Sequence, residues 1–271
     1  MSHPPPVYRL AVDDVIYSFR DLARRRPASL FDCHFLSLFR GLHEQFGTCV
    51  TFNIFFQTHE GDFSLRDFPA DYREEWKANA TWLRLAFHAL QEFPPDRYAG
   101  DRLGDFRRDF EATHAEVLRF AGPEAWIPPA VIHFCRIPDN ALSALSAYGV
   151  RHLAGLNLRH EGAWTAHYGV PDALAARVAK NEEVVDEKSG ILFSLIDLVI
   201  NNCPPTEVAA RLDSRANTPA RPHKVDLLTH EQYSWPFYKN HLPDHPERIL
   251  NAIRWCREHG YQPAFYNSPV G

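Results

Sequence analysis

The sequence lacks the signals of a membrane-inserted or secreted protein. None of its 271 residues belongs to an apolar run approaching the ~18 residues of a transmembrane helix. The opening Met-Ser-His-Pro-Pro-Pro has neither the basic nor the apolar region of a signal peptide. We therefore expect a soluble, cytoplasmic protein with no membrane partner.

The cysteines lack the pattern of a disulfide framework or of a thiolate zinc site. There are five, an odd number, and no two are spaced as C-x-x-C. This usage fits reduced thiols in the core. Any metal bound by this chain would then need histidine and carboxylate ligands.

An excess of positive charge is also missing. The net charge is -5, and the 29 basic and 34 acidic residues are interleaved along the chain. Nucleic acids and anionic membranes are therefore excluded as expected partners. A phosphate-binding loop, a dinucleotide fingerprint and a G-x-S-x-G nucleophile are absent as well.

No Gly/Ser-rich or charge-dense linker divides the chain, so we expect a single domain over residues 1–271. Strands are predicted at 7–12, 49–56, 82–87, 131–134, 152–157, 225–229 and within 191–201, and helices at 30–46, 70–80, 103–120, 139–148, 171–180 and 246–259. Such alternation indicates parallel βαβ units of the α/β class. About seven repeats fit a closed or nearly closed (β/α) barrel, with a doubly wound open sheet as the alternative.

Polar side chains stand at the carboxyl ends of three predicted strands. Asp13 and Asp14 end the first strand, His88 ends another, and His230 with Glu231 ends the strand at 225–229. Adjacent carboxylates are costly to bury unless they share a cation or a proton. Because the carboxyl ends of barrel strands form the working face, the sequence predicts a site there.

A fourth candidate, His114, lies inside the predicted helix 103–120. It continues an apolar stripe with Phe106, Phe110 and Val117, at spacings of four, four and three. A histidine on such a stripe can be a core residue. It can also be a ligand, if this helix reaches back over the mouth of the barrel.

These residues resemble those of a known family. Ala11-Val12-Asp13-Asp14 is similar to the first motif of the NodB-homology polysaccharide deacetylases, and Leu227-Leu228-Thr229-His230 to the last. The phrases Trp82-Leu83-Arg84-Leu85-Ala86-Phe87-His88 and Thr229-His230-Glu231-Gln232-Tyr233 resemble a poorly characterised bacterial branch of that glycoside hydrolase/deacetylase superfamily. The resemblance spans about Tyr8 to Tyr266 and implies a distorted (β/α) barrel of about seven strands.

The resemblance also implies roles. Asp13 would be the general base, Asp14 and His88 ligands of a divalent metal, most simply Zn²⁺, and His230 the general acid. The family places a second histidine four residues after the first, where this chain has Glu92. Either Glu92 or His114 would then be the third ligand, and we favour His114.

Four further residues are candidates for substrate binding. These are His59, in a loop after the second strand; Arg136, in an Arg136-Ile137-Pro138 echo of the arginine-proline motif that orients the base; Glu231; and Trp235. His59 can instead be part of a solvated loop, and Trp235 can pack a lid instead of stacking on a sugar. The family's later aspartate motif has no clear match, and Asp197 is its only candidate.

The sequence therefore predicts a metal-dependent hydrolase that removes an acyl group from a carbohydrate or small acylated substrate. Two alternatives remain open. One is a degenerate barrel that binds carbohydrate without turnover. The other is a metal-free glycosidase in which Asp13 or Asp14 pairs with Glu231. The sequence is compatible with a homo-oligomer.

Overall fold

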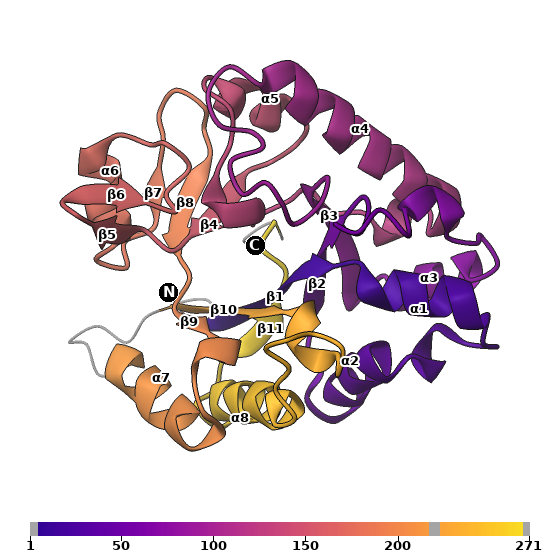
Figure 1. Cartoon of the computed structure of the whole chain (residues 1–271). Helices are drawn as coiled ribbons and strands as arrows, with labels where there is room; N and C mark the ends of the chain where they lie inside the picture. The colour runs from indigo at the N-terminus through magenta and orange to yellow at the C-terminus, as the bar shows by residue number, and fades with distance from the viewer. Residues whose placement is uncertain (1–4, 217–222, 268–271) are drawn as a thin grey trace.

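A computed structural model describes residues 5–216 and 223–267, and its centre is a parallel sheet (Figure 1). The strand order is β3-β2-β1-β10-β9, and β11 pairs with the first residues of β1. The bounds are β1 Val7–Val15, β2 Val50–Phe55, β3 Leu83–Ala89, β9 Leu198–Val199, β10 Lys224–His230 and β11 Gln262–Ala264. Every pair in this sheet is parallel.

Two smaller sheets complete the strand structure of the described residues. One has the order β4-β8-β7, with β4 and β8 parallel and β7 antiparallel to β8. The other is the antiparallel hairpin β5-β6. The bounds are β4 His152–Gly155, β5 Leu158–His160, β6 Ala163–Thr165, β7 Val184–Val185 and β8 Leu192–Leu195.

The helices follow one another around the outside of the strands (Figure 1). Their bounds are α1 Tyr17–Arg25, α2 His34–Phe46, α3 Arg73–Asn79, α4 Leu103–Phe120, α5 Ala141–Ala147, α6 Asp172–Val178, α7 Val208–Ala216 and α8 His245–Glu258. No helix within the described ranges is both long and apolar enough to cross a membrane. The α/β class predicted from the sequence is confirmed.

The strands follow a ring, but strand pairing closes it only in part. From β3, the Ile127 N–H donates to the Leu85 carbonyl at 3.0 Å, and the Ala154 N–H of β4 donates to the Ala130 carbonyl at 2.7 Å. From β8 the chain runs on into β9, which pairs with β10. Between β3 and β4, single hydrogen bonds to segment 127–130 thus take the place of a paired strand. The described strands therefore do not form one continuous seven-stranded barrel sheet.

Two predicted elements differ from the structure. The helix expected over 30–46 is interrupted: a 3₁₀ turn spans Leu30–Asp32, and α2 begins only at His34. Residues 131–134 are not a strand, because a 3₁₀ turn at His133–Cys135 follows Ile132, with a positive φ of 53° at Phe134. This turn redirects the side chains after Ile132.

Strand β1 is the buried centre of the molecule. Tyr8, Leu10 and Val12 are at most 1% exposed, as expected of a parallel strand covered on both faces. On the α2 side, the Phe39 and Phe52 rings meet edge to face, 5.1 Å between centroids. The strand end that carries the two aspartates is therefore rigidly supported.

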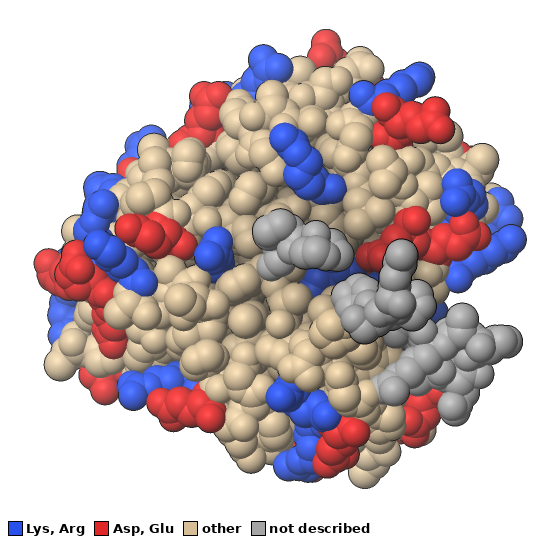
Figure 2. Space-filling model, turned by 180° about the vertical axis from the view of Figure 1, so that it is seen from behind, with Lys and Arg blue, Asp and Glu red and all other residues tan. Residues whose placement is uncertain are grey.

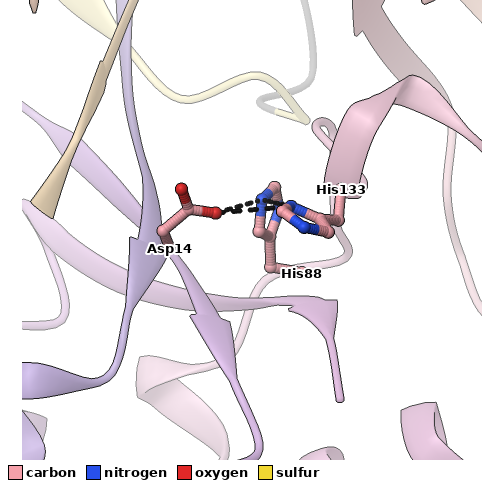
Figure 3. A group of neighbouring side chains, drawn as sticks. All are labelled: Asp14, His88 and His133. Carbon is pink, nitrogen blue, oxygen red and sulfur yellow. Dashed lines mark hydrogen bonds and ion pairs between the residues drawn. The ribbon is translucent and has the colours of Figure 1, made fainter. Parts of the chain in front are cut away.

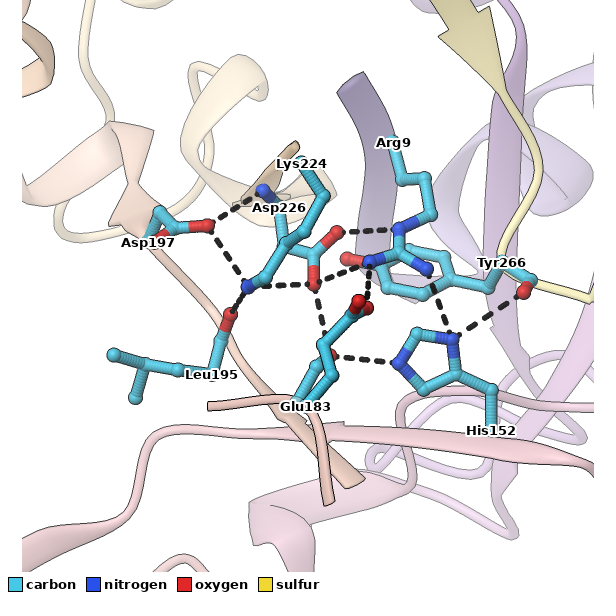
Figure 4. A network of polar contacts seen from close by, with 9 residues as sticks. Arg9, His152, Glu183, Leu195, Asp197, Lys224, Asp226 and Tyr266 are labelled. Atoms are coloured by element: carbon cyan, nitrogen blue, oxygen red, sulfur yellow. Dashed lines mark hydrogen bonds and ion pairs between the residues drawn. The ribbon is translucent and has the colours of Figure 1, made fainter. Parts of the chain in front are cut away.

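An ionic network fills the interior beside the amino half of β1 and β10 (Figure 4). Arg9 and Asp226 are opposite each other in register, and Arg9 Nε donates to Asp226 Oδ1 at 2.6 Å. Lys224 Nζ lies 3.1 Å from Asp197 and 3.2 Å from Asp226. Burial raises the pKa of Asp226, but Arg9 and Lys224 outweigh it and hold that pKa below its usual range. The positive charges of Arg9 and Lys224 are thus paired with the negative charges of Asp226 and Asp197.

The surface charge is mixed, as the sequence indicates. On the face shown in Figure 2, Lys and Arg side chains lie interspersed with Asp and Glu side chains. Among the described residues on this face there is no extended basic surface of the kind that binds polyanions.

His245 at the start of α8 gives the fold a pH dependence. Its ring is fully buried between Thr229 Oγ1 at 2.6 Å and Ser234 Oγ at 2.7 Å. Burial, with nearby His230 and Arg248, lowers its pKa to about 4. The unfolded chain, with an ordinary histidine pKa of about 6.5, binds the proton first, so stability falls as the pH drops from about 6.5 to about 4.

We expect the free energy of unfolding to be lower at pH 5 than at pH 7.5, and His245→Asn to reduce that difference. Each pKa unit is worth about 1.4 kcal/mol, so the loss between pH 6.5 and pH 5 is about 2 kcal/mol. Urea titrations at both pH values measure it. An equal difference in the variant would contradict the assignment to His245.

Candidate metal and acid–base site

A bulge at the end of β1 turns both aspartates toward one pocket. The register between β1 and β2 shifts between Val12 and Val15, and Asp14 has a left-handed φ of 62°. In a regular strand, neighbouring side chains point to opposite faces. Because the bulge re-aims one of them, Asp13 and Asp14 line the same pocket.

Three ligand atoms converge in that pocket (Figure 3). Asp14 Oδ1 lies 3.2 Å from His88 Nε2 and 3.3 Å from His133 Nδ1. The two ring nitrogens are 3.2 Å apart. Asp14 comes from the end of β1, His88 from β3, and His133 from the turn after Ile132.

Hydrogen bonds at the other nitrogen of each ring determine which ring nitrogens carry a proton. His88 Nδ1 lies 3.0 Å from the Val131 carbonyl, and His133 Nε2 lies 2.8 Å from the Glu92 carbonyl. A carbonyl only accepts, so each of these nitrogens carries the proton, and the opposite nitrogen of each neutral ring carries a lone pair. Three acceptors then face one another.

A cation satisfies this arrangement. Asp14 Oδ1 is buried without a hydrogen-bond partner. Protonation of His88 is disfavoured, since burial lowers the pKa of that ring. A tetrahedral ion with bonds of about 2.0–2.1 Å holds its ligand atoms roughly 3.3–3.4 Å apart. The observed spacings of 3.2–3.3 Å match, so the three residues fit a divalent metal with an open position.

Neither third ligand proposed from the sequence belongs to this group. His114 lies in the middle of α4 with its ring against Trp126, 4.7 Å between centroids. Its apolar spacing predicted a fully inward position, but His114 is only half-buried, because Thr113 takes the buried position in that turn of α4. Glu92 lines the pocket and holds His133 through its backbone carbonyl, while its carboxylate is outside the group. His133 takes the third position.

Sequence reasoning missed His133 because residues 131–134 read as an apolar strand. A signal was present: a histidine directly after an apolar run and three residues before Arg136. Arg136 itself is exposed, so the predicted orienting role of that arginine is wrong. Asn53 on β2 replaces it, donating from Nδ2 to Asp13 Oδ1 at 2.7 Å.

The adjacent aspartates differ in acidity. Burial and the charge of Asp14 raise the pKa of Asp13 well above its usual value, although the Asn53 hydrogen bond opposes this. Burial also raises the pKa of Asp14, but the cationic form of the His133 and His88 rings, or a metal ion in place of their proton, outweighs burial and holds that pKa well below normal. Gln232, unforeseen from the sequence, donates from Nε2 to Asp14 Oδ2 at 2.7 Å. Asp14 is thus the ionised member of the pair.

His230 stands opposite Asp13 in the β1–β10 register and lines the same pocket. Its Nδ1 lies 2.9 Å from Asn201 Oδ1, an acceptor, so in the neutral ring Nε2 carries the lone pair. Burial lowers the pKa of His230, although Asp14 acts in the opposite direction. Asn201 orients this ring, whereas Asp197, the candidate for the later aspartate motif, lies 3.1 Å from Lys224.

The pocket has a volume of about 290 Å³. Its lining is acidic and imidazole-rich on one side and apolar on the other. The lining residues are Asp13, Asp14, His88, Glu92, Val131, Ile132, His133, Phe134, Cys135, Leu156, Ala166, Val199, Asn202, Leu228, His230, Gln232 and Tyr233. Asp13, Asp14, His88 and His230, all predicted from strand ends, are brought together.

None of the four predicted substrate-binding residues lines this pocket, the exposed Arg136 included. Glu231 is fully buried, and its carboxylate accepts the backbone N–H groups of Ile16, Tyr17 and Ser18 at 2.6–2.8 Å. It caps α1 and is not a substrate ligand. Trp235 is 8% exposed and packs against His34, which matches the packing alternative. His59 is exposed, with its ring 5.2 Å from that of Phe93.

Known proteins were compared with this chain. No family model and no curated protein matches it. Solved structures do. They include the CE4 domain of a multidomain xylanase from the hindgut metagenome of Trinervitermes trinervoides, at 12% identity, TM-score 0.45, covering 97% of this chain and 88% of that one. A Streptococcus mutans CE4 esterase has 11% identity, TM-score 0.47, and coverages of 96% and 86%.

Peptidoglycan deacetylase PdaC from Bacillus subtilis is a third, at 11% identity, TM-score 0.44, and coverages of 96% and 87%. The matched structures are of the CE4, or NodB-homology, group that the sequence motifs resemble. At this level of likeness they carry no argument about activity. What the site does is argued from its own atoms.

Glu231→Gln tests the capping role. The amide places N–H donors against the α1 backbone N–H groups, so we expect the free energy of unfolding to fall by about 3 kcal/mol. Glu258→Gln, at an exposed position of α8, is the control and should change it by no more than about 0.5 kcal/mol. Equal effects in denaturant titrations would remove the structural role from Glu231.

Proposed function

We propose that this protein is a metal-dependent hydrolase of the polysaccharide-deacetylase type, which removes an acyl group from a carbohydrate or small acylated substrate. The observation that supports it is the convergence of three proton-free ligand atoms from Asp14, His88 and His133. Two imidazoles and one carboxylate favour Zn²⁺ with an open coordination position, which is typical of catalytic sites.

The residues around the ligands supply acid and base. Bound there, a zinc ion would lower the pKa of water from 15.7 toward about 7 and polarise a carbonyl. Asp13 is ionised once a cation offsets the charge of Asp14 beside it, and its free Oδ2 can then take a proton from the attacking water. In its protonated form, His230 can give the Nε2 proton to the departing amine or alcohol and return to the neutral ring, while Asn201 holds Nδ1.

The pocket itself supports acyl-group binding. Val131, Ile132 and Leu228 are among the lining residues and give the pocket an apolar part, which suits a short acyl chain. Of the two alternatives, the metal-free glycosidase loses its second carboxylate, because Glu231 is engaged with α1. The measurements below distinguish the hydrolase from a barrel that binds carbohydrate without turnover.

His133→Ala separates the ligand found in the structure from the one expected from the sequence. We expect the variant to bind Zn²⁺ at least about 100-fold more weakly than the wild type, because one of three ligands is lost. The matched control is His114→Ala, which should bind Zn²⁺ with unchanged affinity. Competition with a chromophoric chelator measures both, and weaker binding in the His114 variant alone would contradict the site.

Asp13→Asn and His230→Gln test the acid and base. Asp13→Asn should keep its metal and lose about 10²–10⁴-fold in kcat on any acetyl ester. His230→Gln should lose a similar factor on an alkyl acetate but about tenfold or less on 4-nitrophenyl acetate, since nitrophenolate departs without a proton. Metal content and initial rates are measured together. A wild-type protein that binds metal but shows no turnover would support the binding barrel instead.

A further inference from the structure

A second cavity of about 380 Å³ adjoins the metal pocket. The two share Leu156, Val199 and Asn202 in their linings, so they are neighbouring parts of one groove. The second cavity runs past the hairpin β5-β6 and the strands β8 and β9 toward α7, the side at the left of Figure 1.

One wall of this second cavity is aliphatic. Five apolar side chains from 156 and from the β8–β9 segment line it: Leu156, Leu195, Ile196, Leu198 and Val199. Leu158 on β5 extends this wall and is 52% exposed, one of the few large apolar side chains that face solvent in the described residues. Leu158 therefore adds apolar surface at the open edge of this cavity.

The other wall is polar and carries cationic side chains. Arg211, Ser214 and Arg215 of α7 line it. Arg211 is 57% exposed and pairs with Glu207 at 3.1 Å, which leaves N–H donors of its guanidinium for a further anion. Asp197 is also in the lining, but its charge faces Lys224 at 3.1 Å.

This lining is unlike a sugar-binding groove. Among the described residues that line the second cavity none is aromatic, and besides Cys203 only Asn202 and Ser214 carry neutral hydrogen-bonding side chains. Sugar rings are held by aromatic stacking and many polar contacts, whereas aliphatic chains need only apolar walls. The aliphatic wall therefore fits an alkyl chain better than a sugar ring.

We propose that the second cavity binds the rest of the substrate, an aliphatic segment that ends in a carboxylate, while the acyl group occupies the metal pocket. The proposal rests on the hydrolase function above and narrows its substrate class to a small acylated amphiphile. The alkyl segment lies along Leu158 and the β8–β9 wall. The carboxylate pairs with the guanidinium of Arg211.

Three acetyl esters of different character distinguish the substrate classes: 8-acetoxyoctanoate, octyl acetate and methyl 6-O-acetylglucoside. We expect kcat/KM to be highest for 8-acetoxyoctanoate and lowest for the glucoside. Leu158→Asp should raise KM about tenfold for both octyl esters and leave that of the glucoside unchanged, with kcat constant. Arg211→Glu should raise KM for 8-acetoxyoctanoate alone.

Val185→Asp is the matched control, since Val185 is 55% exposed and lines neither cavity. It should leave all three KM values unchanged. The proposal is overturned if the glucoside is the best substrate, or if Leu158→Asp affects the three esters equally or not at all.

A binding measurement keeps this proposal separate from the hydrolase function. Octanoate is titrated by calorimetry into protein freed of metal with a chelator, so that its carboxylate cannot bind a metal ion. We expect saturable binding in the wild type and in Val185→Asp, and at least tenfold weaker binding in Leu158→Asp. Binding without hydrolysis of any ester would overturn the hydrolase and keep the amphiphile site, while hydrolysis without octanoate binding would do the reverse.

Discussion

The structure depends on the cost of holding two adjacent carboxylates inside the protein. Asp13 and Asp14 are 3% and 5% exposed, and charges so deeply buried need partners. A bulge at the end of β1 separates their roles: Asp13 receives an amide donor from Asn53, and Asp14 receives one from Gln232 and faces two imidazoles. The pairing of β10 with β1 brings His230 and Gln232 to the same pocket as this pair.

The same two strands carry two different kinds of buried charge. At the amino half of β1 and β10, Arg9 and Lys224 pair with Asp226 and Asp197, so each charge faces one of opposite sign, although Asp197 Oδ1 accepts no hydrogen bond. Four residues further along, Asp13 and His230 are opposite each other, and next to them the Asp14 oxygen has no donor. A network of paired charges stabilises one arrangement of the chain. An open cluster of acceptors is what distinguishes a binding site from internal packing.

Local pattern predicted the elements well where a single face is buried. Helix α4 has the bounds that its apolar spacing indicates, and the polar ends of β1, β3 and β10 were identified because strands that alternate with helices bring their carboxyl ends together. Pattern failed where a turn is determined by distant contacts. At 131–134, the backbone leaves the extended conformation to carry His133 toward His88, and no local propensity encodes that distance.

The sequence by itself determined the α/β class and the carboxylates and imidazoles at Asp13, Asp14, His88 and His230, since residue type and strand position are local properties. Only the tertiary structure decided the third ligand and the role of Glu231. His133 and His114 are both histidines beside apolar residues, and what separates them is where their segments pass in space. Glu231 is next to His230 in sequence, yet its side chain turns to the start of α1, because three unpaired backbone N–H groups lie there.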